Sequence, residues 1–167
     1  MLSRSLVSGV LVSMLFAPGA VAAQGKPAKP APAAPAAGSS AARTVELTAG
    51  DDMKYSVTEI PAKPGETLRI RLVSKGTLPK IAMSHNVVVL KPTAKVIDFV
   101  NAGAMARATD FIPQDMKDQV LAATTMAGPG ETVELVFKVP AGAATYNYVC
   151  TFPGHFAAGM KGTIVVK

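Results

Sequence analysis

Apolar and polar residues alternate along most of the chain after residue 43, which is the pattern of half-buried β-strands. In the clearest case, residues 66–73, three aliphatic side chains alternate with two arginines. One face of this strand would be buried in the core and the other exposed to solvent. Glycine and proline punctuate the alternating segments. The pattern predicts strands at residues 44–47, 53–60, 66–73, 81–90, 119–125, 131–139, 145–150 and 162–166.

One segment breaks the alternation. Residues 98–108 are rich in good helix formers, and Ile97, Val100, Ala104 and Ala108 recur at helical spacing. This segment predicts one helical excursion between strands. About eight strands without a sustained alternation of strand and helix indicate an all-β fold, an antiparallel Greek-key β-sandwich.

The N-terminal region differs in composition from the rest. Arg4, the apolar run 5–16 and the small residues that follow are typical of a secretory signal peptide, and the run is short for a membrane span. Residues 24–43 are mostly Ala, Pro, Gly, Ser and basic residues, a composition that does not order itself. We predict a signal peptide at 1–23, an Ala/Pro-rich disordered linker at 24–43 and one folded domain at 44–167. The protein would be periplasmic or secreted, without stable membrane insertion after signal cleavage.

The net charge of +6 overstates how basic the folded part is. Four of the 17 basic residues precede residue 44, whereas all 11 acidic residues follow it, which leaves the predicted domain at +2. Such a balance does not describe a nucleic-acid surface, and we expect no nucleic-acid partner.

The only cysteine of the chain stands close to one of its two histidines and a methionine. Cys150, His155 and Met160 have the spacing C-x4-H-x4-M and precede the strand at 162–166, an arrangement typical of a metal-binding loop between strands. Such a loop needs a fourth ligand, and the only other imidazole is His85. A lone cysteine in an exported chain forms no internal disulfide, and ligation would protect its thiol.

The types of ligand favour copper over zinc. A thiolate and two imidazoles with a weak axial thioether are the ligand set of a blue copper site. A structural zinc site more often uses several cysteines and seldom a methionine. We therefore predict one copper ion that changes between Cu(I) and Cu(II). A lone histidine on an apolar strand is more often an ordinary core residue, but the second cluster favours a ligand role for His85.

These motifs, in this order, resemble the cupredoxins of the plastocyanin/azurin family, and azurin-like blue copper proteins in particular. The resemblance covers residues 44–167. It rests on segments 78–80 and 83–86, on the helical excursion, and on segments 150–155 and 160–163. It implies a cupredoxin-like copper-binding domain that shuttles single electrons.

The resemblance also implies roles for individual residues. His85, Cys150 and His155 would be equatorial ligands, and Met160 would be the long axial ligand. Asn86 and Thr151 would tie the ligand strand to the ligand loop, which holds the ligands in place. An ordinary strand role for Asn86 remains an alternative.

The chain departs from the azurin pattern in three respects. It lacks azurin's disulfide, since it has one cysteine. The spacing from His155 to Met160 is one residue longer than in azurin. Ser84 stands where azurin has a glycine whose carbonyl approaches the metal, so we expect a more nearly four-coordinate site.

An electron carrier needs a surface at which electrons leave. We expect an apolar docking patch near the exposed edge of His155, which fits the small interfaces of weak redox encounters. The partners would be proteins such as a c-type cytochrome or an oxidoreductase, and the protein would be a monomer. The docking patch consists of Leu78, Pro79, Ala82, Met83, Met105, Phe152, Pro153, Phe156 and Ala157.

Three other functions are weighed against electron transfer. A copper carrier or delivery protein could use identical ligands, and a β-sandwich that binds no metal could act as an interaction domain. Multi-site copper enzymes need more histidines than the two of this chain, both already assigned. We therefore expect no enzymatic activity.

Overall fold

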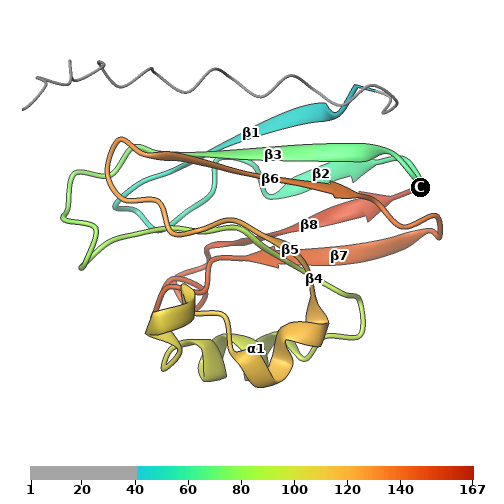
Figure 1. The fold of residues 1–167 in the computed structure, drawn as a ribbon. Helices are drawn as coiled ribbons and strands as arrows, with labels where there is room; N and C mark the ends of the chain where they lie inside the picture. Colours follow the sequence, from blue (N-terminus) through green and yellow to red (C-terminus); the bar gives the residue numbers. More distant parts are fainter. Residues whose placement is uncertain (1–40) are drawn as a thin grey trace, which may run out of the picture. The chain divides into compact units, whose positions relative to one another are not determined.

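The structure, a computed structural model, describes residues 41–167 as two β-sheets packed face to face with a helical segment outside them (Figure 1). The predicted signal peptide and residues 24–40 of the predicted linker lie outside the described residues. The eight strands and one α-helix confirm the predicted all-β sandwich. The elements are β1 (Arg43–Ala49), β2 (Glu59–Ala62), β3 (Thr67–Ser74), β4 (Val88–Leu90), α1 (Val96–Gly103), the 3₁₀ turns η1 (Arg107–Thr109) and η2 (Gln114–Gln119), β5 (Val120–Ala123), β6 (Thr132–Lys138), β7 (Ala144–Val149) and β8 (Lys161–Val166).

The strand order is β1-β3-β6 in one sheet and β2-β8-β7-β4-β5 in the other. Most neighbours are antiparallel, but β1 pairs with β3 and β2 pairs with β8 in parallel. The prediction of an antiparallel sandwich is therefore wrong for these two pairs. The alternation of apolar residues shows which face of a strand is buried, but it does not show which strand lies beside it or in which direction that strand runs.

The main core lies between the two sheets. Leu68, Ile70 and Leu72 of β3 are fully buried, as their alternation predicts. Arg69 and Arg71, which stand between them, form ion pairs with glutamates on the neighbouring strands. Burial of such aliphatic side chains contributes roughly 1.5–3 kcal/mol each. The core thus holds the two sheets as a firm frame for the loops at their ends.

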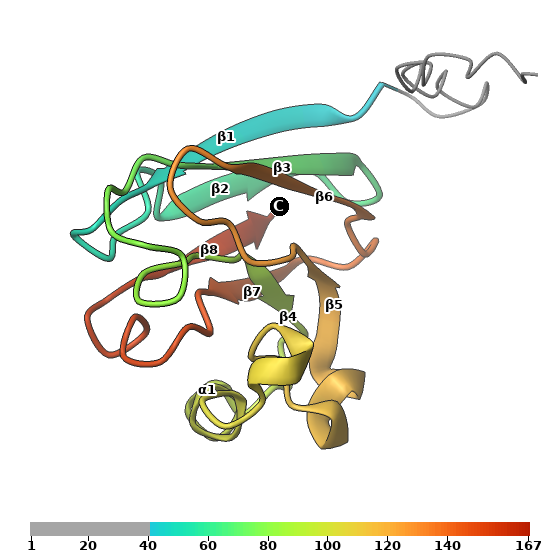
Figure 2. The ribbon, with the colours of Figure 1, turned by 60° about the vertical axis from the view of Figure 1, so that its left-hand side comes forward.

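Strand β4 is buried on both faces. Val89 belongs to the main core, whereas Val88 and Leu90 form a second core with Phe99 of α1 and Val149 of β7. Both views place α1 outside the five-stranded sheet, next to β4 (Figures 1 and 2). Cover on both faces explains why β4 reads as an uninterrupted apolar run instead of an alternating one.

Two predicted strands lose most of their expected residues. Only residues 59 and 60 of the predicted strand at 53–60 lie in a strand, β2, which continues to Ala62. Before them, Met53 has a φ of 55° and Tyr55 makes only an isolated bridge with Ala49. The predicted strand at 81–90 is reduced to β4. Its first residues belong to a turn that alternation alone does not reveal.

The helix begins and ends earlier than predicted, at Val96–Gly103 instead of 98–108. At Gly103 the chain passes so close to another segment that a Cβ atom would lie 2.5 Å from the carbonyl oxygen of Phe111. This close approach leaves no room for a side chain at the last residue of the helix. Within residues 41–167, none of the helices has the length and apolar character needed to span a membrane.

Candidate metal centre

The four predicted ligands come from two segments at one end of the sandwich. Cys150 directly follows β7, and His155 and Met160 lie in the loop that leads to β8. His85 precedes β4, where it exchanges two backbone hydrogen bonds with Ala127 (2.9 and 2.7 Å). His85 is thus held by a bridge to a neighbouring segment, although it lies outside a regular strand.

The loop between β7 and β8 is closed by its own backbone. The N–H of Cys150 donates to the carbonyl of Met160 (3.1 Å), and the N–H of Met160 donates to the carbonyl of His155 (2.9 Å). Gly154 and Gly159 have φ angles of 85° and 98°, which residues with a side chain rarely adopt. These bonds and turns fix the three loop residues relative to one another.

Three of these side chains converge on one point. The ligand atoms of His85, Cys150 and His155 all lie within 4.8 Å of one another, close enough to hold one metal ion. Cys150 Sγ is 3.5 Å from His155 Nδ1, and the two imidazole centroids are 5.0 Å apart. The side chain of Met160 is fully buried in the same core cluster as Cys150.

One member of this cluster, His85, is buried without a hydrogen-bond partner for its ring in the described part of the chain. Within residues 41–167, neither ring nitrogen of His85 has a hydrogen-bond partner, although the residue is fully buried. A buried polar group without a partner costs roughly 1–3 kcal/mol. A thiol and two imidazoles that face one another in a buried site suit a soft or borderline metal such as copper. The residues present therefore fit the predicted ion.

Burial also determines the protonation of the three groups. It raises the pKa of the Cys150 thiol to about 12, against the hydrogen bonds that the backbone groups of Asn86 and Phe152 make to the sulfur. Burial, together with the neighbouring His85, lowers the pKa of His155 to about 4. Burial likewise lowers the pKa of His85. At neutral pH the metal-free site therefore holds two neutral imidazoles, whose lone pairs are available, and one protonated thiol.

The predicted pair next to the ligands is brought together. Asn86 Nδ2 donates to Thr151 Oγ1 (2.9 Å), and the N–H of Thr151 donates to Asn86 Oδ1 (2.9 Å). Asn86 Nδ2 also lies 3.2 Å from the carbonyl oxygen of Asp110. Both members of the pair are buried. These bonds join the segment that carries His85 to the segment that carries Cys150.

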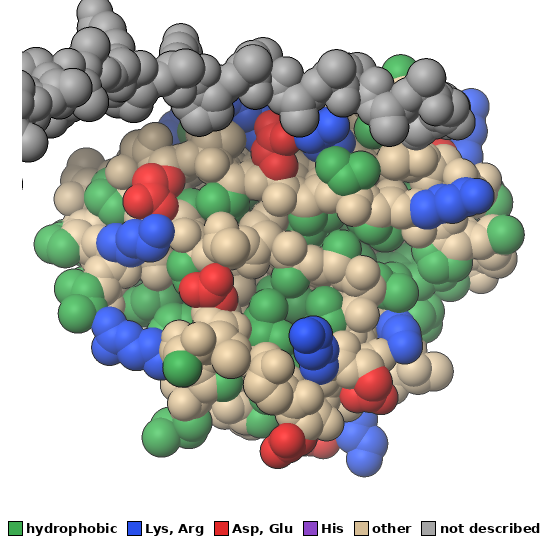
Figure 3. Space-filling model, viewed as in Figure 1, with side chains coloured by type: hydrophobic (Ala, Val, Ile, Leu, Met, Phe, Trp, Pro, Cys, Tyr) green, Lys and Arg blue, Asp and Glu red, His purple; other side chains and the backbone are tan. Residues whose placement is uncertain are grey.

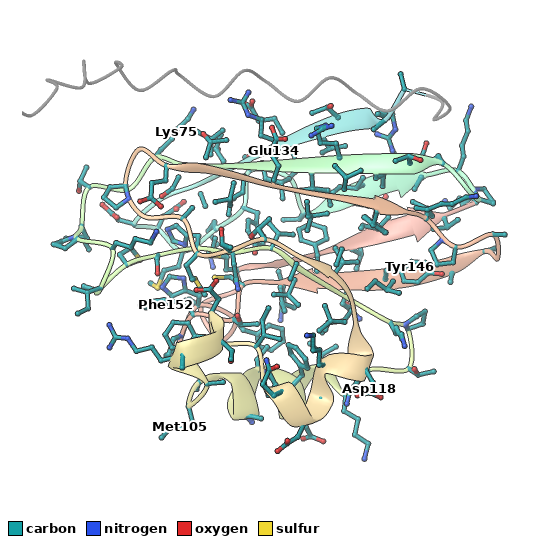
Figure 4. The ribbon with its side chains drawn as sticks, in the orientation of Figure 1. Lys75, Met105, Asp118, Glu134, Tyr146 and Phe152 are labelled. Atoms are coloured by element: carbon teal, nitrogen blue, oxygen red, sulfur yellow. The ribbon has the colours of Figure 1, made fainter. Side chains whose placement is uncertain are left out.

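The expectation of an exposed edge of His155 is wrong, because this residue is 2% exposed. The residues of the docking patch lie at the surface to different degrees. Leu78, Pro79, Ala82, Met105, Pro153 and Ala157 are exposed, whereas Met83, Phe152 and Phe156 are half-buried. Hydrophobic side chains stand out at the left-hand end of the molecule in Figure 3. In Figure 4, Phe152 lies at this end, near the helical segment, and Met105 points outward.

Two apolar residues near the patch, Ile81 and Phe111, are not predicted from the sequence. Ile81 is 70% exposed and, with Phe111, lines a cleft of about 350 Å³ beside Phe152. The rings of Phe111 and Phe152 are 5.2 Å apart, and those of Phe152 and His155 are 4.7 Å apart. An alternating pattern places Ile81 in a strand, so its exposure becomes visible only when the turn is known.

The fold and this site define a class, the blue copper proteins that carry electrons. A family model described as "Copper binding proteins, plastocyanin/azurin family" matches residues 41–167. The chain belongs to this family, which confirms the predicted resemblance, fold and copper cofactor.

Individual relatives agree with this placement. Auracyanin-A of Chloroflexus aurantiacus is 36% identical over 167 residues, which are 98% of this chain and 97% of the relative. Auracyanin-B of the same organism is 35% identical over 75% of this chain, and the match spans only 52% of that relative's length. The solved structure of azurin iso-2 from Methylomonas sp. strain J superimposes with a TM-score of 0.66 at 33% identity, covering 77% of this chain and 99% of that one.

Proposed function

We propose that His85, Cys150 and His155 hold one copper ion with Met160 as the long axial ligand. We further propose that the protein shuttles single electrons between redox partners outside the cytoplasm. The observation that carries the proposal is the buried convergence of one thiol and two neutral imidazoles, one of which has no hydrogen-bond partner among the described residues.

Rigid support of the ligands is what an electron carrier requires of its protein. Bound copper would supply a one-electron couple between Cu(I) and Cu(II). The chain supplies constraint: the backbone bonds close the ligand loop, and the Asn86–Thr151 bonds join it to the His85 segment. Ligands held in this way keep their positions when the charge at the site changes, which favours fast electron exchange.

The docking patch is the proposed exit for electrons. His155 is only 2% exposed, and Phe152, which contacts its ring, belongs to the patch. The proposed occupant is a redox protein with a matching apolar surface, such as a c-type cytochrome or an oxidoreductase. Weak redox encounters use small interfaces of this kind. A monomer with one such patch suffices for the role.

The location of these partners follows from the N-terminal region. We propose that residues 1–23 are a signal peptide, that 24–43 are a linker whose last residue, Arg43, already belongs to β1, and that 44–167 are the copper-binding domain. The protein would then work in the periplasm or be secreted. Catalysis is not part of the proposal, since the chain has two histidines and both are assigned to one site.

One experiment on the copper-loaded full chain separates electron transfer from copper delivery. The midpoint potential is measured by voltammetry, and the self-exchange rate is measured by NMR line broadening. An electron carrier shows a reversible couple and fast self-exchange. An irreversible couple, or exchange too slow to broaden the lines, would favour a copper delivery protein.

The same measurement locates the exit. Ala157→Asp is expected to slow self-exchange at least about tenfold, because two charged patches must meet and like charges across an interface cost several kcal/mol. The midpoint potential should hardly change. Ala141→Asp is the matched control, since Ala141 is also exposed but precedes β7 at the strand end opposite Cys150. Equal rates in both variants would place the exit elsewhere.

A further inference from the structure

Tyr55 is a buried tyrosine whose hydroxyl contacts the residue that follows the proposed ligand His85. It lies between β1 and β2 and is 4% exposed. Its hydroxyl donates a hydrogen bond to the carbonyl oxygen of Asn86. Burial raises the pKa of Tyr55 well above its ordinary value, so the hydroxyl keeps its proton and remains a donor.

Asn86 is the residue through which this bond can act on the site. It follows the proposed ligand His85, and its backbone makes a hydrogen bond to the sulfur of Cys150. Its side chain is bonded to Thr151 on the ligand loop. Tyr55 therefore bonds to the backbone of a residue that follows one proposed ligand and is itself bonded to the neighbour of another.

We infer that Tyr55 is a positioning residue that holds the Asn86 backbone in place for its hydrogen bond to the Cys150 sulfur and thereby tunes the electron density of the thiolate. The inference rests on the proposed copper site. Hydrogen bonding around the cysteine sulfur is one of the factors that set the potential of such sites, and outer partners orient those that touch the ligands. A tyrosine 31 residues away from Asn86 thus belongs to the redox machinery.

Tyr148 provides a matched control within the same pair of rings. The two rings are 5.4 Å apart, and both hydroxyls donate to a backbone carbonyl. The acceptor of Tyr148 is Val57, which lies on neither ligand segment. Removal of either hydroxyl deletes one hydrogen bond to a backbone carbonyl, but only the bond from Tyr55 ends on Asn86.

The test compares Tyr55→Phe with Tyr148→Phe in the copper-loaded full chain. Looser positioning of Asn86 weakens the bond to the sulfur and leaves it richer in electrons, which stabilises Cu(II). We expect Tyr55→Phe to lower the midpoint potential and to move the sulfur-to-copper absorption to longer wavelength. Tyr148→Phe should match the wild type in both. Unchanged values in Tyr55→Phe, or equal shifts in both variants, would overturn the inference.

A second measurement does not need copper. In the ¹H–¹⁵N NMR spectrum of the metal-free protein, the Asn86 amide signal is expected to shift in Tyr55→Phe and to stay within the spread of other distant amides in Tyr148→Phe. An unmoved Asn86 signal in Tyr55→Phe would overturn the positioning role even if the copper site is correct. If the wild type binds no copper while the signal moves as expected, the proposed function fails and the contact to Asn86 stands.

Discussion

Cys150→Ser is expected to abolish the intense visible absorption of the copper-loaded protein. The absorption requires transfer of charge from the thiolate to copper, and the chain has only this one cysteine. Copper affinity should fall by more than about 100-fold, because loss of even an outer partner of a ligand costs 10–100-fold. The measurement is a titration with copper followed by absorption and by competition with a chelator.

Ser84→Ala is the control for this substitution. Ser84 is buried beside His85, and its hydroxyl contacts the sulfur of Met126 at 3.6 Å. Since the backbone is kept, the colour should persist with little change. A Cys150→Ser protein with unaltered copper affinity, or a colourless wild-type complex, would contradict the assignment of Cys150 as a ligand.

The second large effect is a dependence of copper affinity on pH. We expect the affinity for Cu(I) to rise about tenfold per pH unit, and so about 100-fold between pH 7 and pH 9. The thiol of Cys150, with a pKa raised to about 12, carries a proton throughout this range and must lose it to bind. A rise in pH removes this competition, so affinity increases with pH.

The two imidazoles do not add to this slope. The pKa of His155 is lowered to about 4 and that of His85 lies below its ordinary value, so both are neutral above pH 7. The measurement is competition with a chelator for Cu(I) whose own protonation is known. In Cys150→Ser the slope should fall to near zero. A flat profile in the wild type would mean an ionised thiol, and a slope of two would mean a protonated imidazole, and either result contradicts the predicted protonation.

Much of the frame is predictable because burial on one face leaves a period of two in the sequence. The strand at 66–73 alternates as β3 does, with its aliphatic residues inward. The cluster of ligands is also predictable, since the chain offers one thiol and two imidazoles and leaves no choice among them. Because so few residues could act as ligands, the sequence predicts the site more completely than the strands and the helix around it.

Other features depend on contacts that no local pattern records. The parallel pairing of β1 with β3 depends on where the chain crosses between sheets. Met53 adopts a positive φ without being a glycine, so nothing local marks the end of regular structure there. The bond from Tyr55 to Asn86 joins residues that are distant in sequence. An alternating pattern can indicate that this tyrosine is buried, but not which residue its hydroxyl contacts.

The most direct test of the copper site is the visible and EPR spectrum of the full chain after one equivalent of Cu(II) is added. We predict an intense absorption near the red end of the visible range that saturates at one copper per chain, with the small parallel hyperfine splitting expected of a thiolate-bound ion. A weakly coloured complex with the wide splitting of ordinary cupric sites, or no binding at all, would contradict the proposed site.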